Sequence, residues 1–439
     1  MKSLVFKSKG TGFILPLLVL MSVTFPAAAQ DFVLSLSPGV GTAPHSVVAA
    51  DVNNDGKLDL ISVNSGDNTL IILTNDGSGS FASNATYNVG SVPLSVVAAD
   101  VNNDLKLDLI IANSGDNTVT VLTNNGDGTF TPSSTNAVGN TPYSVVAADL
   151  TGNSNMDLIS VNFNDSTLTV LTNDGAGNFG FSATYAVGIN PQSVVAVDVN
   201  GDGTPDLISC NFGDGTLTVL TNNGGGVFGS NATYTVGSGP VSVATADVDR
   251  DGTPDLISCN FGDGTLTVLT NNGGGVFGSN ATCTVGNGPE SVVAADVNDD
   301  GAPDLISANI YDNTLTVLTN DGHGYFMHSS TNTVGSGPIL VTAADVNGDG
   351  APDLITVNFG ANADGNTLTV LLNLPALNLQ FTGAGTAIIS WSPAWPGYEL
   401  QQNEDISTTN WSDISNPGGT NCVTISPVIG NNFFRLRHP

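Results

Sequence analysis

The chain has very few basic residues. Eight of its 439 residues are lysine or arginine against 39 aspartates and glutamates, so the formal net charge is −31. Lys2, Lys7 and Lys9 precede residue 10, and the rest of the chain carries 5 − 39 = −34. Binding to a phosphate backbone requires clustered cations, so nucleic acid is excluded as a partner. Since only 11% of residues are charged, the carboxylates must be concentrated at particular places, which indicates cation binding.

Long apolar runs are equally scarce. One extends from Phe13 to about Phe25, after the three lysines and before Ala27-Ala28-Ala29. This order is typical of a secretory signal peptide, and the run is too short for a membrane span. We therefore interpret residues 1–29 as a signal peptide cleaved after Ala29. The expected product is secreted, extracellular or periplasmic, and has no membrane span.

The four cysteines do not form the spaced framework of a small disulfide-rich domain. Cys210 and Cys259 occupy a repeat position that is valine or alanine elsewhere, for example Val63 and Ala112. Both are therefore predicted to be small buried apolar residues. No window shows sustained helical periodicity, so an all-β protein is expected.

An internal repeat fills most of the chain. The segment that begins SVVAADVNNDG recurs with its first aspartate at a constant interval of 49 residues, at Asp51, Asp100, Asp149, Asp198, Asp247, Asp296 and Asp345. In the first unit, four β-type runs are expected at Ser46–Ala50, Leu60–Val63, Leu70–Thr74 and about Ala82–Val89. Four strands in a unit of this length predict a β-propeller blade.

The two ends of the repeat region predict how the ring closes. The seventh unit ends near Asn373 after three strands, while Asp31–Gly41 supplies a spare strand at the start. Residues 30–373 are thus predicted to form a seven-bladed propeller closed by the N-terminal strand, which protects the exposed edges. Residues 374–439 contain Trp391, Trp395 and Trp411 and predict a small β-sandwich-like domain. Those tryptophans could form its core or stack on sugars.

A nine-residue acidic loop lies between the first two strands of each unit. In Asp51–Asp59, side-chain oxygens at positions 1, 3, 5 and 9 and the carbonyl of position 7 can surround one hard cation. Glycine at position 6 permits a tight turn. Calcium fits this set better than magnesium because it accepts more ligands and looser geometry. The alternative is that Asp and Asn only bond backbone N–H groups of the turn.

The predicted calcium ligands come from six units. They are Asp51, Asn53, Asp55, Lys57 and Asp59; Asp100, Asn102, Asp104 and Asp108; Asp198, Asn200, Asp202, Thr204 and Asp206; Asp247, Asp249, Asp251, Thr253 and Asp255; Asp296, Asn298, Asp300, Ala302 and Asp304; and Asp345, Asn347, Asp349, Ala351 and Asp353. Unit 2 has Leu105 at the glycine position, and unit 3 substitutes Thr151 and Asn153 for ligands. About five strong sites are expected, with two weak or lost.

These loops, the Phe-Gly pairs at Phe179, Phe228 and Phe277, and turns such as Gly237-Ser238-Gly239-Pro240 resemble FG-GAP/VCBS repeats, the integrin α-subunit type of propeller. The resemblance spans Phe32 to about Asn373. It implies that the loop binds calcium at a turn of each blade and that the propeller serves in binding or adhesion.

A variable position follows the connecting proline of each unit. Propeller geometry places it at the mouth of the central channel, on the face opposite the acidic loops, and we predict a ligand rim of His45, Leu94, Tyr143, Gln192, Val241, Glu290 and Ile339. Loops between the second and third strands add aromatics and carboxylates to this face, such as Phe163 with Asp165. Neutral drift at an exposed rim, with the phenylalanines packed between blades, is the alternative interpretation.

The expected function is non-enzymatic. No nucleophile motif, phosphate-cradling loop or zinc motif occurs, and the regular aspartates are explained by metal or turn chemistry. We therefore expect a secreted, monomeric binding or adhesion module for an extracellular glycan or protein, with structural calcium. A calcium-dependent polysaccharide lyase or hydrolase is the alternative.

Overall fold

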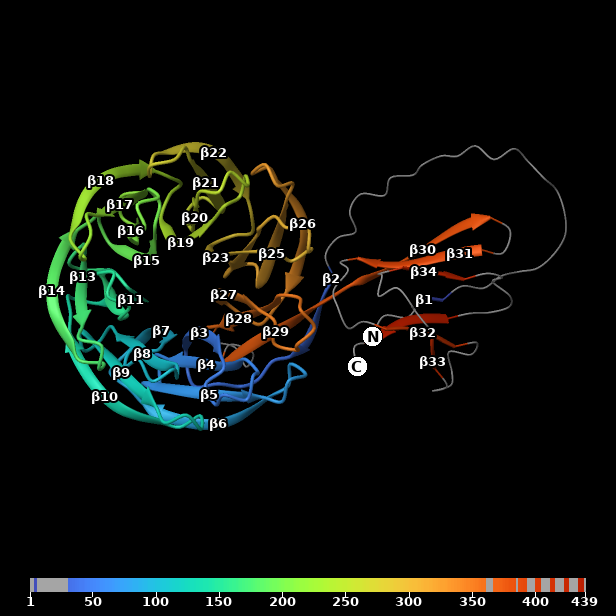
Figure 1. Cartoon of the computed structure of the whole chain (residues 1–439), viewed down its shortest axis with the longest axis horizontal. Helices are drawn as coiled ribbons and strands as arrows, with labels where there is room; N and C mark the ends of the chain where they lie inside the picture. The colour runs from blue at the N-terminus through green and yellow to red at the C-terminus, as the bar shows by residue number, and fades with distance from the viewer. Residues whose placement is uncertain are drawn as a thin grey trace.

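A computed structural model describes residues 4–5, 31–360, 366–383, 386–392, 399–403, 411–414, 422–425 and 433–437. All regular elements in these ranges are β-strands. Seven four-stranded sheets stand around a common axis, and two further sheets of four and three strands lie beside the ring (Figure 1). None of the described segments is a helix long and apolar enough to cross a membrane.

Six blades are built from consecutive antiparallel strands. The first three are β3 (Pro44–Ala50), β4 (Asp59–Asn64), β5 (Thr69–Asn75) and β6 (Phe81–Asn88); β7 (Pro93–Ala99), β8 (Asp108–Asn113), β9 (Thr118–Asn124) and β10 (Phe130–Ala137); and β11 (Pro142–Ala148), β12 (Asp157–Asn162), β13 (Thr167–Asn173) and β14 (Phe179–Ala186). The next three are β15 (Pro191–Val197), β16 (Asp206–Asn211), β17 (Thr216–Asn222) and β18 (Phe228–Thr235); β19 (Pro240–Ala246), β20 (Asp255–Asn260), β21 (Thr265–Asn271) and β22 (Phe277–Thr284); and β23 (Pro289–Ala295), β24 (Asp304–Asn309), β25 (Thr314–Asn320) and β26 (Phe326–Thr333).

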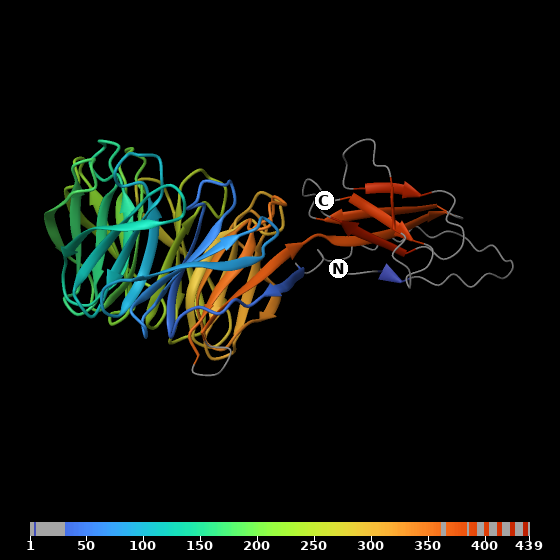
Figure 2. The ribbon, with the colours of Figure 1, turned by 90° about the horizontal axis from the view of Figure 1, so that it is seen from below.

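The seventh blade joins the two ends of the repeat region. It consists of β27 (Pro338–Ala344), β28 (Asp353–Asn358), β29 (Thr367–Leu374) and β2 (Asp31–Leu36). β2 pairs antiparallel with β29, with Phe32 opposite Asn373. Figures 1 and 2 show the blue β2 beside the orange strands of this blade. The predicted closure of the ring by the N-terminal strand is therefore confirmed.

The apolar core lies between the blades. The second strand of every blade is buried at all six positions, because it packs against both neighbouring blades. This explains why apolar residues and small polar ones follow one another without an alternating pattern, as in Leu60-Ile61-Ser62-Val63. Seven clusters of buried residues lie in the seven gaps between neighbouring blades. Cys210 and Cys259 lie fully buried in these clusters as free thiols, as predicted.

Hydrogen bonds also link each blade to its predecessor. The asparagine that ends the third strand donates its amide to a carbonyl of the preceding blade's acidic loop, as Asn75 Nδ2 does to Val346 O at 2.7 Å. The same bond occurs at Asn124, Asn173, Asn222, Asn271, Asn320 and Asn373. The acidic loops thus belong to a circular hydrogen-bonded belt.

The remaining strands form the C-terminal part. One sheet contains β30 (Ala376–Gly383), β31 (Thr386–Ser392) and β34 (Cys422–Ile425); the other contains β1 (Leu4–Val5), β32 (Glu399–Asn403), β33 (Ser412–Asp413) and β35 (Phe433–Arg437). Both sheets contribute to one buried cluster that includes Trp391 and Phe434, so Trp391 belongs to the core. Of the predicted signal peptide, only Leu4 and Val5 are described, and they pair with β35. Its cleavage after Ala29, and Trp395, lie outside the described residues.

Candidate metal loops and channel mouth

Hydrogen bonds hold each acidic loop in a tight turn. In the first blade, Asp51 Oδ2 accepts the N–H of Gly56 at 2.8 Å, and Asn53 Oδ1 accepts the N–H of Asp55 at 2.9 Å. Gly56 has a φ of 81°, the left-handed conformation that the sequence predicted for position 6. The bonds expected from turn chemistry are therefore present. A carboxylate has about four lone-pair sites, so these bonds leave room for a cation.

The aspartate at position 9 is completely buried in all seven blades: Asp59, Asp108, Asp157, Asp206, Asp255, Asp304 and Asp353. In each blade its two oxygens accept one N–H from position 2 of the loop and one from the asparagine that ends the third strand. Unit 3 retains this aspartate although it has lost other predicted ligands. Position 9 therefore has a structural role that does not depend on metal.

Burial makes these carboxylates reluctant to ionise. It raises the pKa of Asp255 to about 6, of Asp304 to about 7 and of Asp353 to about 8, with the neighbouring loop aspartates adding to the effect. A bound cation would reverse this effect by stabilising the ionised form.

Three carboxylates converge in the fifth blade. Asp247, Asp249 and Asp255 each bring an oxygen within 4.8 Å of the others. Among the described residues, this is the one such group of acidic, histidine or cysteine side chains, because position 3 is an asparagine or threonine in the other units. Asp251 stands outside the group and accepts the N–H of Thr253 at 2.8 Å. Oxygen ligands at positions 1, 3 and 9 fit a calcium ion, the chemistry predicted for this loop.

Units 2 and 3 depart from the pattern as expected. Leu105 adopts a φ of 65° with its side chain 90% exposed, and Ser154 occupies the same position of unit 3 at 66°. A leucine in this conformation is strained by roughly 1–2 kcal/mol.

Leu105→Gly is therefore expected to raise the melting temperature slightly, by the equivalent of roughly 0.5–1 kcal/mol after the greater chain entropy of glycine is subtracted. Gly203→Leu is the matched control, because a Cβ there would meet no atom within 4 Å. It should lower the melting temperature through backbone strain alone. A decrease with Leu105→Gly in differential scanning calorimetry would contradict this account.

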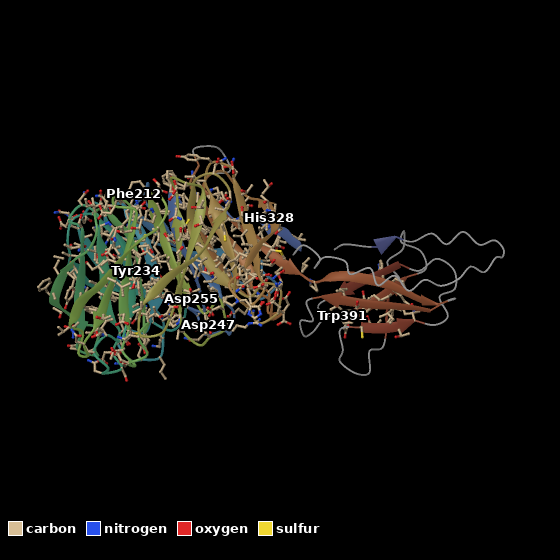
Figure 3. All side chains as sticks on the ribbon, turned by 90° about the horizontal axis from the view of Figure 1, so that it is seen from above. Phe212, Tyr234, Asp247, Asp255, His328 and Trp391 are labelled. Carbon is tan, nitrogen blue, oxygen red and sulfur yellow. The ribbon has the colours of Figure 1, made fainter. Side chains whose placement is uncertain are left out.

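The channel mouth lies on the opposite face from these loops. Figure 3 shows Phe212 at one face of the ring and Asp247 and Asp255 toward the other. A cavity of about 360 Å³ opens at the mouth and is lined by all seven predicted rim residues. Six serines one position further along the repeat also line it, together with Ile310, Leu340 and Phe359. The sequence analysis did not predict these serines as lining residues. A serine follows the variable rim residue in six of the seven units, and this constant position was the signal that could have identified them.

One side of the cavity is aromatic. The rings of His45 and Tyr143 meet edge-on with centroids 5.7 Å apart, and Phe359 packs against His45 at 6.2 Å. His45 Nδ1 lies 2.8 Å from the carbonyl of Leu94, so Nδ1 carries the proton in the neutral ring. Burial lowers the pKa of His45, which favours that neutral form.

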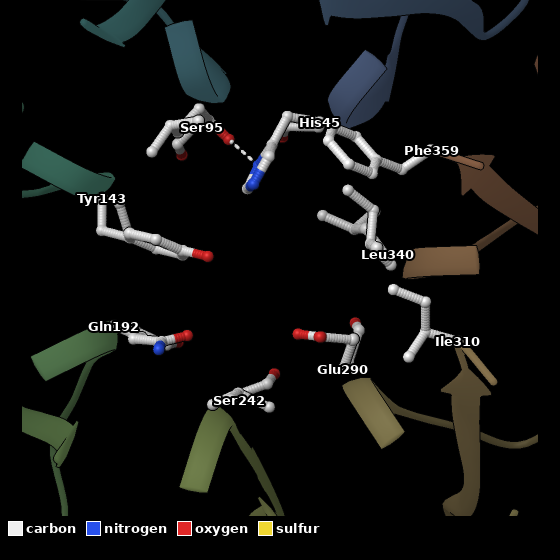
Figure 4. Close-up of a pocket in the computed structure, with 16 residues that line it drawn as sticks. His45, Ser95, Tyr143, Gln192, Ser242, Glu290, Ile310, Leu340 and Phe359 are labelled. Carbon is white, nitrogen blue, oxygen red and sulfur yellow. Dashed lines mark hydrogen bonds between the residues drawn. The ribbon is translucent and has the colours of Figure 1, made fainter. Parts of the chain in front are cut away.

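An acidic group stands across from this wall. Glu290, Tyr143 and Gln192 all point into the cavity in Figure 4. Burial raises the pKa of Glu290 to about 7, and burial with the Glu290 charge raises the pKa of Tyr143 to about 12. The mouth therefore combines one carboxyl, one phenol, one imidazole and one amide, contributed by four different blades.

The carboxylates of the loops between the second and third strands have a different role. Asp165 Oδ2 accepts the N–H of Asn140 at 2.7 Å, and Asp214 and Asp312 hold the connection from the preceding blade in the same way. The adjacent Phe163 packs 5.9 Å from Tyr143. Phe163 and Phe261 are half-buried, whereas Phe212, Tyr311 and Phe359 stay 37%, 68% and 40% exposed, so packing between blades accounts for only part of this set.

These features define a class, an all-β seven-bladed propeller with acidic turns on one face and a variable cavity on the other. A model of the FG-GAP-like repeat matches residues 51–111, 102–160, 149–209, 198–258, 251–307 and 296–356. The chain belongs to the FG-GAP-like repeat family.

The solved structures that resemble it share its fold. They include BBS1N in complex with ARL6DN (TM-score 0.58, 12% identity, 79% of this chain and 98% of that chain). A virginiamycin B lyase from Staphylococcus aureus with quinupristin matches with a TM-score of 0.52 and 13% identity over 78% of this chain and 100% of that one. The periplasmic gluconolactonase PpgL of Pseudomonas aeruginosa matches with a TM-score of 0.52 and 16% identity over 67% and 86%. A search of curated proteins found no match.

Proposed function

We propose that this protein is a secreted calcium-stabilised propeller that binds an extracellular ligand at the mouth of its central channel. The observation that carries the proposal is the contrast between the two faces. The acidic loops repeat nearly unchanged, whereas the seven variable rim positions meet in one cavity. A rigid scaffold that carries variable side chains at one concave place is typical of a binding site.

The propeller fold occurs in both binding proteins and enzymes, so the fold does not distinguish between these two functions. The residues of the site must do so. BBS1N is seen in complex with another protein, which supports a protein as the ligand of this chain. A glycan is the other ligand class that we propose. We assign calcium a structural role for two reasons. The acidic loop recurs in every unit, whereas an active site normally occurs once, and these loops lie on the face opposite the cavity.

Changing Tyr143 and Glu290 together to phenylalanine and glutamine is expected to reduce ligand binding at least tenfold. Both side chains point into the cavity, and both lose their polar groups in this variant. Glycan and matrix-protein arrays would identify the ligand, first in calcium and then in chelator, and titration would measure the loss. Asp165→Asn is the control, because Asp165 lies in a loop on the same face and is not among the residues that line the cavity. Unchanged affinity of the double variant would remove the mouth as the binding site.

A polysaccharide lyase or hydrolase is the second candidate, favoured by the meeting of His45, Tyr143 and Glu290 in one cavity. Hydrolysis by two carboxylates needs a second acid, and Glu290 is the one carboxyl among the lining residues that the structure describes. Release of unsaturated or reducing sugar ends from a panel of polysaccharides would establish this activity.

A further inference from the structure

Glu290 lacks a partner for its carboxyl group. It lies near the start of β23 and points into the channel-mouth cavity, facing Tyr143 from the other side (Figure 4). Within the ranges that the structure describes, its side chain makes no hydrogen bond or ion pair. A carboxyl group withdrawn from water without a partner is unfavourable. A ligand that supplies the missing partner would therefore gain affinity at this point.

Charge determines which kind of ligand fits. Among the residues that the structure describes, no lysine or arginine lines the cavity. Lys57, Lys106 and Arg250 belong to the acidic loops on the other face, where each is within 4.0 Å of an aspartate. With a net charge of −31, the chain repels anions and attracts cations. An anionic sugar would meet no compensating charge in the cavity.

The lining favours an organic cation over a metal ion. Calcium or magnesium needs several oxygen ligands at fixed distances, and the described part of the lining offers a single carboxyl. Ile310 and Leu340 instead provide apolar surface beside Glu290, and the aromatic rings of Tyr143 and His45 stand opposite. Alkyl groups pack on such surfaces, and ammonium groups are attracted to aromatic faces. A volume of about 360 Å³ is sufficient for a small head group.

We propose that the channel mouth binds an organic ammonium group, with Glu290 as its counter-charge and the aromatic and aliphatic wall around its alkyl part. This inference rests on the proposed function of the mouth and specifies its ligand class. The ammonium group belongs either to a free small amine or to the lysine side chain of a protein, and the two sources present the same chemistry to the cavity.

The binding has a defined pH dependence. The ammonium group pairs with ionised Glu290, whose pKa burial raises to about 7. Affinity therefore rises with pH up to about 7 and then levels off. The other titratable groups near this carboxyl are Tyr143 on β11 and Cys259 on β20, both with pKa values raised far above this range, and His45 on β3, whose pKa is lowered. A neutral ligand that accepts a hydrogen bond from protonated Glu290 would show the opposite trend.

The test is a calorimetric titration of the whole protein with n-butylammonium, tetramethylammonium and an acetylated, amidated lysine peptide. Butanol and butyrate are the neutral and anionic counterparts. We expect the ammonium ligands to bind, the counterparts to bind at least tenfold more weakly, and Glu290→Gln to reduce ammonium affinity at least tenfold. Glu399→Gln is the matched control, since it removes the same charge from an exposed position at the start of β32. The thermal melting curve of each variant verifies folding.

The outcomes distinguish a free amine from a lysine side chain as the source of the ammonium group. They also distinguish failure of this inference from failure of the proposed function. Binding of the free amines alone indicates a small molecule, and binding of the peptide as well indicates a lysine side chain. Absence of ammonium binding at tens of millimolar, or equal binding by Glu290→Gln, overturns this inference. The proposed function would still stand if a ligand from the arrays lost affinity in the Tyr143 and Glu290 double variant, and it fails separately if that variant binds normally.

Discussion

Chelation of calcium is expected to lower the melting temperature of this protein by on the order of 20 °C. A ligand held at a hundred times its Kd stabilises a fold by about 2.7 kcal/mol per site. Five intact loops would together contribute more than about 10 kcal/mol, and a domain of this size loses a degree or two for each kcal/mol. Removing the cations also leaves Asp247, Asp249 and Asp255 close together without neutralisation.

Differential scanning calorimetry in millimolar calcium and then in excess EDTA measures this shift, and elemental analysis at saturation counts the ions. About five ions are expected, with magnesium restoring only part of the stability because it requires stricter geometry. A melting temperature that is indifferent to the chelator, with no bound ions, would reduce the loops to turn chemistry.

The fold could be predicted from the sequence because its determinants repeat. The 49-residue period fixed the blade, and the missing fourth strand of the last unit matched the spare segment at Asp31. Strand limits in the first blade differ from the predicted ones by a few residues at most, for example Pro44–Ala50 in place of Ser46–Ala50. The same pattern of strands and turns occurs in seven units of one chain, so a chance resemblance in one unit has little effect on the predicted fold.

The features that escaped prediction depend on contacts between blades. Nothing in the sequence pairs Asn75 with the carbonyl of Val346, which is 271 residues away. Sequence reasoning placed Glu290 and Tyr143 on the same rim, but it did not predict that their side chains gather with those of His45 and Gln192 into one cluster. The cluster exists because four variable residues, one from each of four blades, turn into the same space. Position 9 was predicted to be a metal ligand, with bonding to backbone N–H groups as the alternative for the whole loop, and Asp157 shows these buried hydrogen bonds in a loop without carboxylates at positions 3 and 5.

Substituting position 9 in two different blades is expected to separate the structural role from the metal role. Asp157 accepts the N–H groups of Leu150 at 3.2 Å and Asn173 at 2.8 Å, and Asp255 accepts the equivalent pair, each at 2.8 Å. Asparagine has the same shape, but its amide nitrogen cannot accept the second N–H. Each Asp→Asn change should therefore cost about 1–3 kcal/mol in the absence of metal.

Calcium should make the two variants unequal. Asp157→Asn lies in a loop with few ligands, so its cost should be the same in calcium and in EDTA. Asp255→Asn also removes a carboxylate from the group with Asp247 and Asp249, and the loss of the bound ion should bring its total cost in calcium to roughly twice that of Asp157→Asn. In EDTA, Asp255→Asn should cost slightly less stability than Asp157→Asn, because it relieves repulsion among the three carboxylates of the fifth blade. Equal shifts of the two melting temperatures in calcium would mean that position 9 serves only the hydrogen-bonded belt, and that the fifth blade, the most acidic of the seven, gains no stability from a cation.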